Sequence, residues 1–111
     1  MQTSPQGTLD PEEIRKFEAM AATWWDPSGP FKPLHRFNPA RLEYVLGHAR
    51  ARFTTPLEHL TLLDIGCGGG LLAEPLARTG LKVLGIDGAE KNIAAARIHA
   101  ESTATPVRYE A

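Results

Sequence analysis

The chain has 111 residues, 42% of them hydrophobic and 23% charged, which is ordinary for one small globular domain. The formal net charge is −1 and basic residues occur at most in pairs, so we exclude nucleic acid as the main ligand. With a single cysteine an internal disulfide is excluded. No apolar stretch approaches the roughly 20 residues of a membrane span or resembles a secretory leader. We therefore expect a cytoplasmic protein.

Two helices are predicted in the N-terminal half. Asp10-Pro11 combines an acidic N-cap with proline at the first helical position, and apolar residues then follow at helical spacing over about 11–24. Asn38-Pro39 repeats this signature and predicts a second helix over about 39–52. The N-terminal half is therefore expected to be mainly helical.

The segment between these helices is rich in proline, with Pro27, Pro30, Pro33 and Pro39 close together. Proline lacks the backbone N–H that helices and sheets need, so an irregular loop is predicted over 26–38. Together the helices and this loop form a predicted N-terminal helical segment over 1–56.

Strand and helix candidates alternate in the remainder, 57–111. Strands are predicted over about 61–65, 82–87 and 107–110, and helices over about 71–79 and 89–101. This order predicts an α/β fold with a parallel sheet. Gly80 is the expected C-cap of the first of these helices, and Pro75 inside it requires a late start or a kink.

The turn after the first strand carries the most informative pattern. Asp64 ends the strand, and four glycines fall within the next six residues, including Gly66, Gly68 and Gly70. Glycine allows positive φ and leaves no Cβ in the way, so a flat ligand could lie against the main chain. Asp87 ends the next strand, close to the roughly 20-residue spacing of a ribose-binding carboxylate in a βαβ nucleotide site.

Two ligand classes fit this turn, a dinucleotide and S-adenosylmethionine. The dinucleotide pattern G-x-G-x-x-G fails from Gly66, because Leu71 stands at its third place, and fits only when shifted to Gly68. The pattern acid-x-Gly-x-Gly-x-Gly of adenosylmethionine sites is met in register from Asp64. A carboxylate repels a pyrophosphate and tolerates a sulfonium and an ammonium, so the charge also favours adenosylmethionine.

The chain resembles the class I methyltransferases, and more narrowly the ubiquinone-biosynthesis O-methyltransferases, over about 14–101. The motifs that carry the resemblance are Lys16-Phe17-Glu18-Ala19, Trp24-Trp25-Asp26, Phe31-Lys32-Pro33-Leu34-His35-Arg36, Asn38-Pro39-Ala40-Arg41-Leu42 and Asp64-Ile65-Gly66-Cys67-Gly68-Gly69-Gly70.

The resemblance implies a Rossmann-like class I methyltransferase fold, of which this chain holds the first three strands behind two N-terminal helices. It also implies O-methylation of ring hydroxyls of polyprenylated phenols and quinols, with S-adenosylmethionine as the donor. Arg41, Gly66 and Asp87 match the family's donor contacts, and Asp64 and Gly68 join them through the glycine pattern. Peripheral contact with the inner membrane surface and a complex with other ubiquinone-biosynthesis enzymes are further expectations.

Several points stay open at this stage. His35 and His48 are candidates for the base that deprotonates the acceptor, but neither is assigned, and no metal-ligand spacing is visible. Trp24 and Trp25 suit either a membrane surface or the cover of the sheet edge or substrate cleft. A nucleotide-dependent oxidoreductase and an inactive, incomplete methyltransferase domain are the alternatives.

Overall fold

The computed structural model describes residues 10–111, so the first nine residues of the predicted helical segment lie outside the described part. Its elements are, in chain order, α1 (Pro11–Trp25), α2 (Lys32–Arg52), the 3₁₀ turn η2 (Leu57–His59), β1 (Thr61–Ile65), α3 (Ala73–Arg78), β2 (Lys82–Ile86), α4 (Glu90–Ser102) and β3 (Arg108–Glu110).

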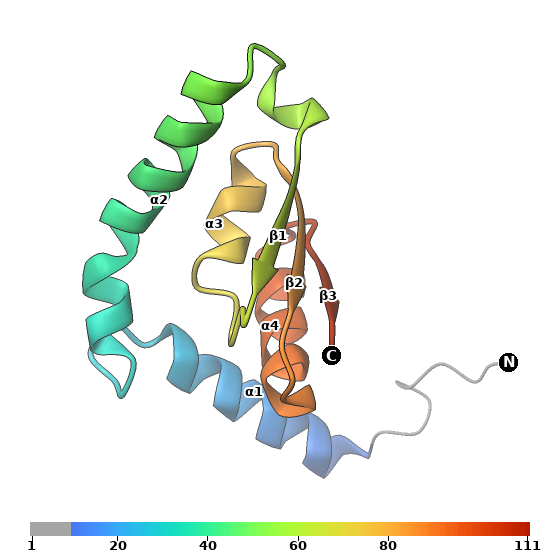
Figure 1. Ribbon diagram of the computed structural model, residues 1–111. Coiled ribbons are helices and arrows are strands. Elements are labelled where there is room, and N and C mark those ends of the chain that lie inside the picture. Colours follow the sequence, from blue (N-terminus) through green and yellow to red (C-terminus); the bar gives the residue numbers. More distant parts are fainter. Residues whose placement is uncertain (1–9) are drawn as a thin grey trace, which may run out of the picture.

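The three strands form one parallel sheet in the order β1-β2-β3. Each crossover is a helix, α3 between β1 and β2 and α4 between β2 and β3, as parallel pairing requires. The sheet carries α2 and α3 on one side, and α1 runs past α4 near the carboxyl ends of the strands (Figure 1). The predicted α/β fold with three parallel strands is confirmed.

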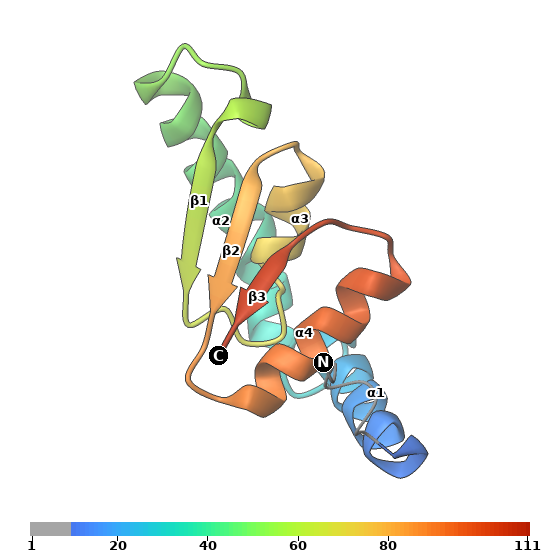
Figure 2. The ribbon, with the colours of Figure 1, turned by 90° about the vertical axis from the view of Figure 1, so that its right-hand side faces the viewer.

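The hydrophobic core lies between the sheet and its helices. Leu76 of α3 and Ile93 of α4 are fully buried there, together with Val83 of β2. The opposite face of the sheet carries no helix of the described chain (Figure 2). On that face Leu63 and Ile65 of β1 are 53% and 75% exposed, although both are large apolar residues.

Helix α2 begins at Lys32, so the prediction of an irregular loop is wrong for residues 32–38. Pro33 occupies the first turn of the helix, where no backbone N–H is needed, and therefore starts α2 instead of preventing it. Pro39 lies inside the helix, and Asn38 is not its N-cap. The Asn38 amide instead donates to the Leu71 carbonyl at 2.6 Å, a tertiary contact that offsets part of the cost of an internal proline.

The other helix ends follow the local sequence. Asp10 caps α1 by accepting a hydrogen bond from the Glu13 N–H at 2.8 Å. Helix α3 starts at Ala73, two residues later than predicted, which places Pro75 in its first turn and confirms the late start. Gly80 follows α3 at φ 107°, a conformation that favours glycine. Among residues 10–111, no helix combines the length and hydropathy needed to cross a bilayer.

Candidate functional site

The turn that follows β1 folds against the carboxyl end of β2. The backbone N–H groups of Gly66 and Cys67 both donate to the Ile86 carbonyl, at 2.8 and 2.9 Å. Gly66, Gly68 and Gly70 take φ values of 75°, 56° and 90°, which confirms the positive φ predicted for them. The turn therefore depends on glycine for its shape, before any ligand is considered.

The glycines of the turn differ in what surrounds them. A Cβ at Gly66 would meet no heavy atom within 4 Å, so the backbone there is open. At Gly68 a Cβ would stand 2.7 Å from the Trp24 indole, and at Gly69 it would overlap the same ring. Tyr109 blocks Gly70 in the same way. The expectation that the missing Cβ atoms leave room for a ligand therefore holds at Gly66, whereas protein side chains fill the space at the other three.

Asp87 stands directly after β2 and contacts the glycine turn. Its Oδ2 accepts a hydrogen bond from the Gly68 N–H at 2.9 Å, and its Oδ1 accepts one from the Ala89 N–H at 2.8 Å. The Ala89 bond chiefly, with help from Gly68 and Asn92 and against the effect of burial, lowers the pKa of Asp87. Asp87 is therefore ionised at neutral pH, and its carboxylate oxygens keep lone pairs for further donors.

Asp64 lies in β1, where it pairs with Gly85 of β2. It is on the face of the sheet that the helices cover. Its Oδ2 is buried and has no hydrogen-bond partner among the described residues. Burial raises the pKa of Asp64, the Arg41 guanidinium opposes that rise, and the Asp87 carboxylate adds to it. A buried carboxylate oxygen without a donor is costly, so this position fits a ligand that brings a positive, hydrogen-bonding group.

Arg41 of α2 interacts electrostatically with Asp64. Its Nη1 donates to the Asn38 Oδ1 at 3.4 Å, while the Asn38 amide is itself bound to the Leu71 carbonyl just after the glycine turn. Asn38 therefore joins α2 to the turn and orients Arg41. The sequence interpretation assigned Asn38 to a helix cap and missed this contact, for which the only signal was its place three residues before Arg41.

The two candidate histidines make no hydrogen bond to these groups within residues 10–111. The His35 Nε2 donates to the Trp24 carbonyl at 2.8 Å and so joins α2 to the end of α1. His48 packs against Tyr44 on the exposed side of α2, with ring centroids 4.4 Å apart. Neither contact identifies a histidine as the general base expected to deprotonate the acceptor, so that base stays unassigned.

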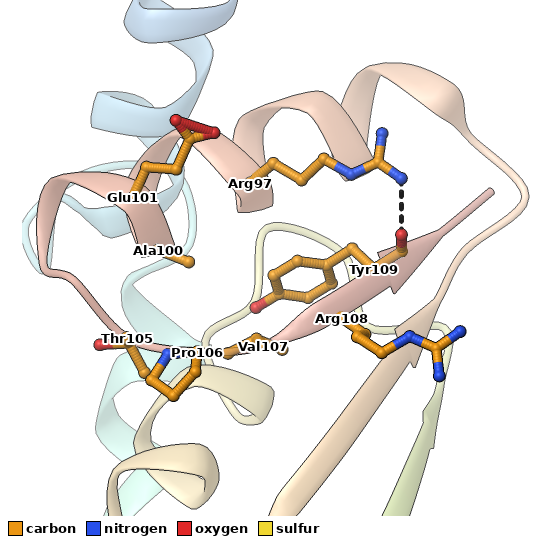
Figure 3. A pocket seen from close by; sticks show the side chains of 8 residues that line it. All are labelled: Arg97, Ala100, Glu101, Thr105, Pro106, Val107, Arg108 and Tyr109. Carbon is orange, nitrogen blue, oxygen red and sulfur yellow. Dashed lines mark hydrogen bonds between the residues drawn. The ribbon is translucent and has the colours of Figure 1, made fainter. Parts of the chain in front are cut away.

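A separate hollow of about 340 Å³ lies between α4 and β3 (Figure 3). Arg97 crosses it to donate to the Tyr109 carbonyl at 2.6 Å, while Arg108 points outward at its rim. None of the five residues predicted to bind the donor lines this hollow. The candidate site stays at the carboxyl edge of the sheet. There the turn with Gly66 and Gly68 meets Asp87, and Asp64 interacts electrostatically with Asp87 and with Arg41 of α2.

Comparisons with known proteins show which fold and family the chain resembles. A family model described as a methyltransferase domain matches residues 62–111, which include all but the first residue of β1, the glycine turn and Asp87. The crystal structure of magnesium protoporphyrin IX methyltransferase from Synechocystis PCC 6803 with bound SAM is similar, with a TM-score of 0.61 and 25% identity. The similarity covers 97% of this chain and 56% of that one. The fold is therefore that of the class I adenosylmethionine-dependent methyltransferases, with the first three strands present.

More similar sequences narrow the family. Ubiquinone biosynthesis O-methyltransferase of Paramagnetospirillum magneticum is 59% identical over 93% of this chain, and that of Roseobacter denitrificans is 54% identical over 96%. The chain covers 44% and 45% of these two relatives, so it spans less than half of their length. It corresponds to the N-terminal part of the ubiquinone biosynthesis O-methyltransferases, which confirms the resemblance found in the sequence.

Proposed function

We propose that this chain forms the donor-binding half of an S-adenosylmethionine-dependent O-methyltransferase of ubiquinone biosynthesis. The observation that carries the proposal is the buried, unpartnered Asp64 Oδ2 beside Arg41 and the open backbone of Gly66. Residues 57–111 supply the glycine turn and both carboxylates, and the helical segment 1–56 supplies Arg41. The names and high identity of the relatives support the same function.

Each residue of the site suits one group of the donor. Asp64 would accept from the ammonium, which gives its buried oxygen the missing partner. Arg41 would hold the donor's carboxylate, since a guanidinium can form two parallel hydrogen bonds to it. Asp87 would accept from the ribose hydroxyls, and the main chain at Gly66 and Gly68 would lie beside the donor. A sulfonium also tolerates two nearby carboxylates, whereas an anion would not.

Methyl transfer makes modest demands on these residues. The donor supplies a methyl group already activated by its sulfonium, and the acceptor oxygen displaces the sulfur in line. The chain's own part is to orient the donor, since correct alignment removes much of the barrier. A phenol resembling tyrosine has a pKa near ~10 and must lose its proton to become a good nucleophile. The described residues provide no assigned base for that step.

The acceptor is inferred from the relatives' names, which refer to ubiquinone biosynthesis, and from the motifs over 14–101. We propose ring hydroxyls of polyprenylated phenols and quinols as the substrates. A cytoplasmic protein with peripheral contact at the inner membrane surface, in a complex with other ubiquinone-biosynthesis enzymes, would meet such substrates where their tails are dissolved. The location, the membrane contact and the complex are extensions of the proposal, and they depend on the substrate class being correct.

A nucleotide-dependent oxidoreductase is the competing function. Its pyrophosphate would have to lie near two carboxylates, Asp64 and Asp87, of which Asp87 is held ionised. The unpartnered Asp64 oxygen would then face a second anion instead of a hydrogen-bond donor. The third possibility, an incomplete and inactive methyltransferase domain, predicts a broad melt and fast amide exchange for the 111-residue chain alone.

The test is a calorimetric titration of the full-length protein with S-adenosylhomocysteine and, separately, with NAD. We expect binding of the first and no response to the second. Asp87→Ala should weaken the affinity at least about tenfold, because two charge-assisted hydrogen bonds to the ribose are lost. Glu101→Ala, which removes an exposed carboxylate on α4, is the control and should bind as the parent does. Binding of NAD without a response to adenosylhomocysteine would favour the oxidoreductase.

A further inference from the structure

The end of α1 packs directly onto the glycine turn. The Trp24 indole occupies the space that side chains at Gly68 and Gly69 would need, so these residues are glycine to admit the ring. The other partner of Trp24 is Phe31, stacked on it with centroids 3.7 Å apart and planes 6° apart. Trp24 is therefore held between the start of α2 and the turn.

Trp25, the next residue, is hydrogen-bonded to the turn. Its Nε1–H donates to the Gly69 carbonyl at 3.0 Å, across 44 positions of sequence. The same indole stacks on the His99 ring of α4, with centroids 3.7 Å apart and planes 1° apart. The orientation of Trp25 is thus set from α4 while its N–H holds the turn.

A buried carboxylate fixes His99 in turn. Glu74 of α3 is fully buried, and it accepts hydrogen bonds from the His99 Nδ1 at 2.7 Å and the Thr103 hydroxyl at 2.6 Å. Arg78 forms an ion pair with it at 2.5 Å. A buried carboxylate with this many partners is well satisfied and therefore rigid. Rigid contacts thus run from Glu74 through His99 and Trp25 to the carbonyl of Gly69.

We propose that Trp24 and Trp25, together the tryptophan clamp, are positioning residues for the methyl donor. They act through the turn and contact none of the five residues by hydrogen bond. Gly69 follows Gly68, whose N–H is bound to the Asp87 carboxylate, so the clamp also sets where Asp87 stands. This inference rests on the proposed function, because it assigns the clamp to the same donor site.

The clamp also bears on the open question about the two tryptophans. Both indoles are half-buried and have partners on α2, α4 or the glycine turn. At a membrane interface the Trp25 indole N–H would donate to a polar group there, but in this structure it already donates to the Gly69 carbonyl. These contacts favour the interpretation in which the tryptophans cover the site over the one in which they enter a membrane.

The test is Trp25→Phe in the full-length protein, since phenylalanine keeps an aromatic ring beside His99 while it removes the N–H donor together with one ring of the indole. We expect the dissociation constant for S-adenosylhomocysteine to rise about three- to tenfold, the worth of one hydrogen bond. Amide exchange should speed up at Gly70 in the turn and at Glu74 in the first turn of α3, and stay unchanged in β2. Phe53→Leu, at the opposite end of α2, is the matched aromatic control and should alter neither measurement.

The outcomes are distinguishable. If Trp25→Phe binds adenosylhomocysteine as tightly as the parent, or if turn exchange is unchanged, the clamp is overturned while the proposed function stands. If Trp25→Phe and Phe53→Leu weaken binding equally, the effect is general destabilisation and the clamp is again overturned. If the parent itself binds no adenosylhomocysteine, the proposed function fails and the clamp, which depends on it, fails with it.

Discussion

At the scale of single residues, two aspartates at the same edge of the sheet have pKa values shifted in opposite directions. Burial, against the effect of Arg41 and with that of Asp87, raises the pKa of Asp64 from the ordinary 3.8, and its Oδ2 has no donor among residues 10–111. Asp87 accepts two backbone N–H bonds, so its pKa is lowered from the same value. Cys67 lies between them in the turn, and burial first, then both carboxylates, raise the pKa of its thiol to about 12. Cys67 is therefore an inert, buried thiol.

This difference predicts how donor affinity depends on pH. Because the folded-state pKa of Asp64 is raised, Asp64 takes up a proton first as pH falls from neutral toward about 4, and its attraction for an ammonium is lost. Asp87 stays ionised over the same range and loses its charge only below its ordinary 3.8. We expect affinity for adenosylhomocysteine, measured calorimetrically, to weaken over this range.

Two variants separate the contributions of Asp64 and Asp87 to the affinity and to its pH dependence. Asp64→Asn should bind about five- to tenfold more weakly at pH 7 and show a flat profile down to about pH 4. It should also melt at a higher temperature at neutral pH without ligand, because a desolvated charge that disfavours the folded state has been removed. Asp87→Asn should bind more weakly throughout and keep the slope of the parent. A flat profile in the parent would contradict the role of Asp64.

At the scale of elements, contacts between elements decide where the chain departs from local preference. Helix α2 runs through Pro39 and over a stretch that its prolines alone would leave irregular. Contacts made from this stretch hold it in place, among them Asn38 to the Leu71 carbonyl and His35 to the Trp24 carbonyl. The glycine turn is likewise shaped by α1, because Trp24 requires small residues beneath it.

The Trp24 packing predicts a specific pair of coupled substitutions. Gly69 does not have a positive φ, so alanine is excluded there only by overlap with Trp24. Gly69→Ala should cost about 1–3 kcal/mol of unfolding free energy in the parent, measured by urea denaturation of the full-length protein. In a Trp24→Ala background the cost should fall clearly but not vanish, because the ring atoms are gone while the Cβ of residue 24, 2.8 Å from the added Cβ, remains. The difference between the two costs is the coupling energy.

Gly66→Ala is the control for this pair. Gly66 has open space around it but a φ of 75°, so its cost is conformational, about 1–2 kcal/mol, and should be the same with or without Trp24. Equal costs of Gly69→Ala in both backgrounds would show that Trp24 does not set the requirement for glycine.

At the scale of the whole molecule, the helices within residues 10–111 cover one face of the sheet and leave the other exposed. Leu63 and Ile65 of β1 are exposed on the other face, beside the partly buried Leu84 and Ile86 of β2. Contiguous apolar side chains of this kind favour association with another surface. This exposed face of the sheet is separate from the proposed donor site, since Asp64 is on the face that the helices cover.

We expect the 111-residue chain, when produced alone, to associate as its concentration rises. The double variant Leu63→Ser with Ile65→Ser should reduce the association, because these are the most exposed apolar residues of the sheet. Static light scattering over a concentration series measures the effect. Phe53→Ser, which removes an exposed aromatic residue away from the sheet, is the control. A monomer at every concentration would contradict the prediction.

Much of the donor site was predictable because its signals are local. The order of strand and helix, the positive-φ glycines, the capping of α1 and the late start of α3 all follow from residues a few positions apart. Asn38, Trp25 and Glu74 could not be assigned from sequence. Their partners, Leu71, Gly69 and His99, lie 33, 44 and 25 positions away, beyond any periodic or capping pattern.

The sequence by itself determined the α/β order, the family, and the two carboxylates that flank a glycine turn, because spacing along a strand or turn places neighbours directly. Only the tertiary structure decided that Gly66 is open while Gly68 and Gly69 lie beneath Trp24. It also decided that the Asp64 Oδ2 has no hydrogen-bond donor within residues 10–111. Burial and the partners of a polar atom depend on segments that meet only when the chain folds.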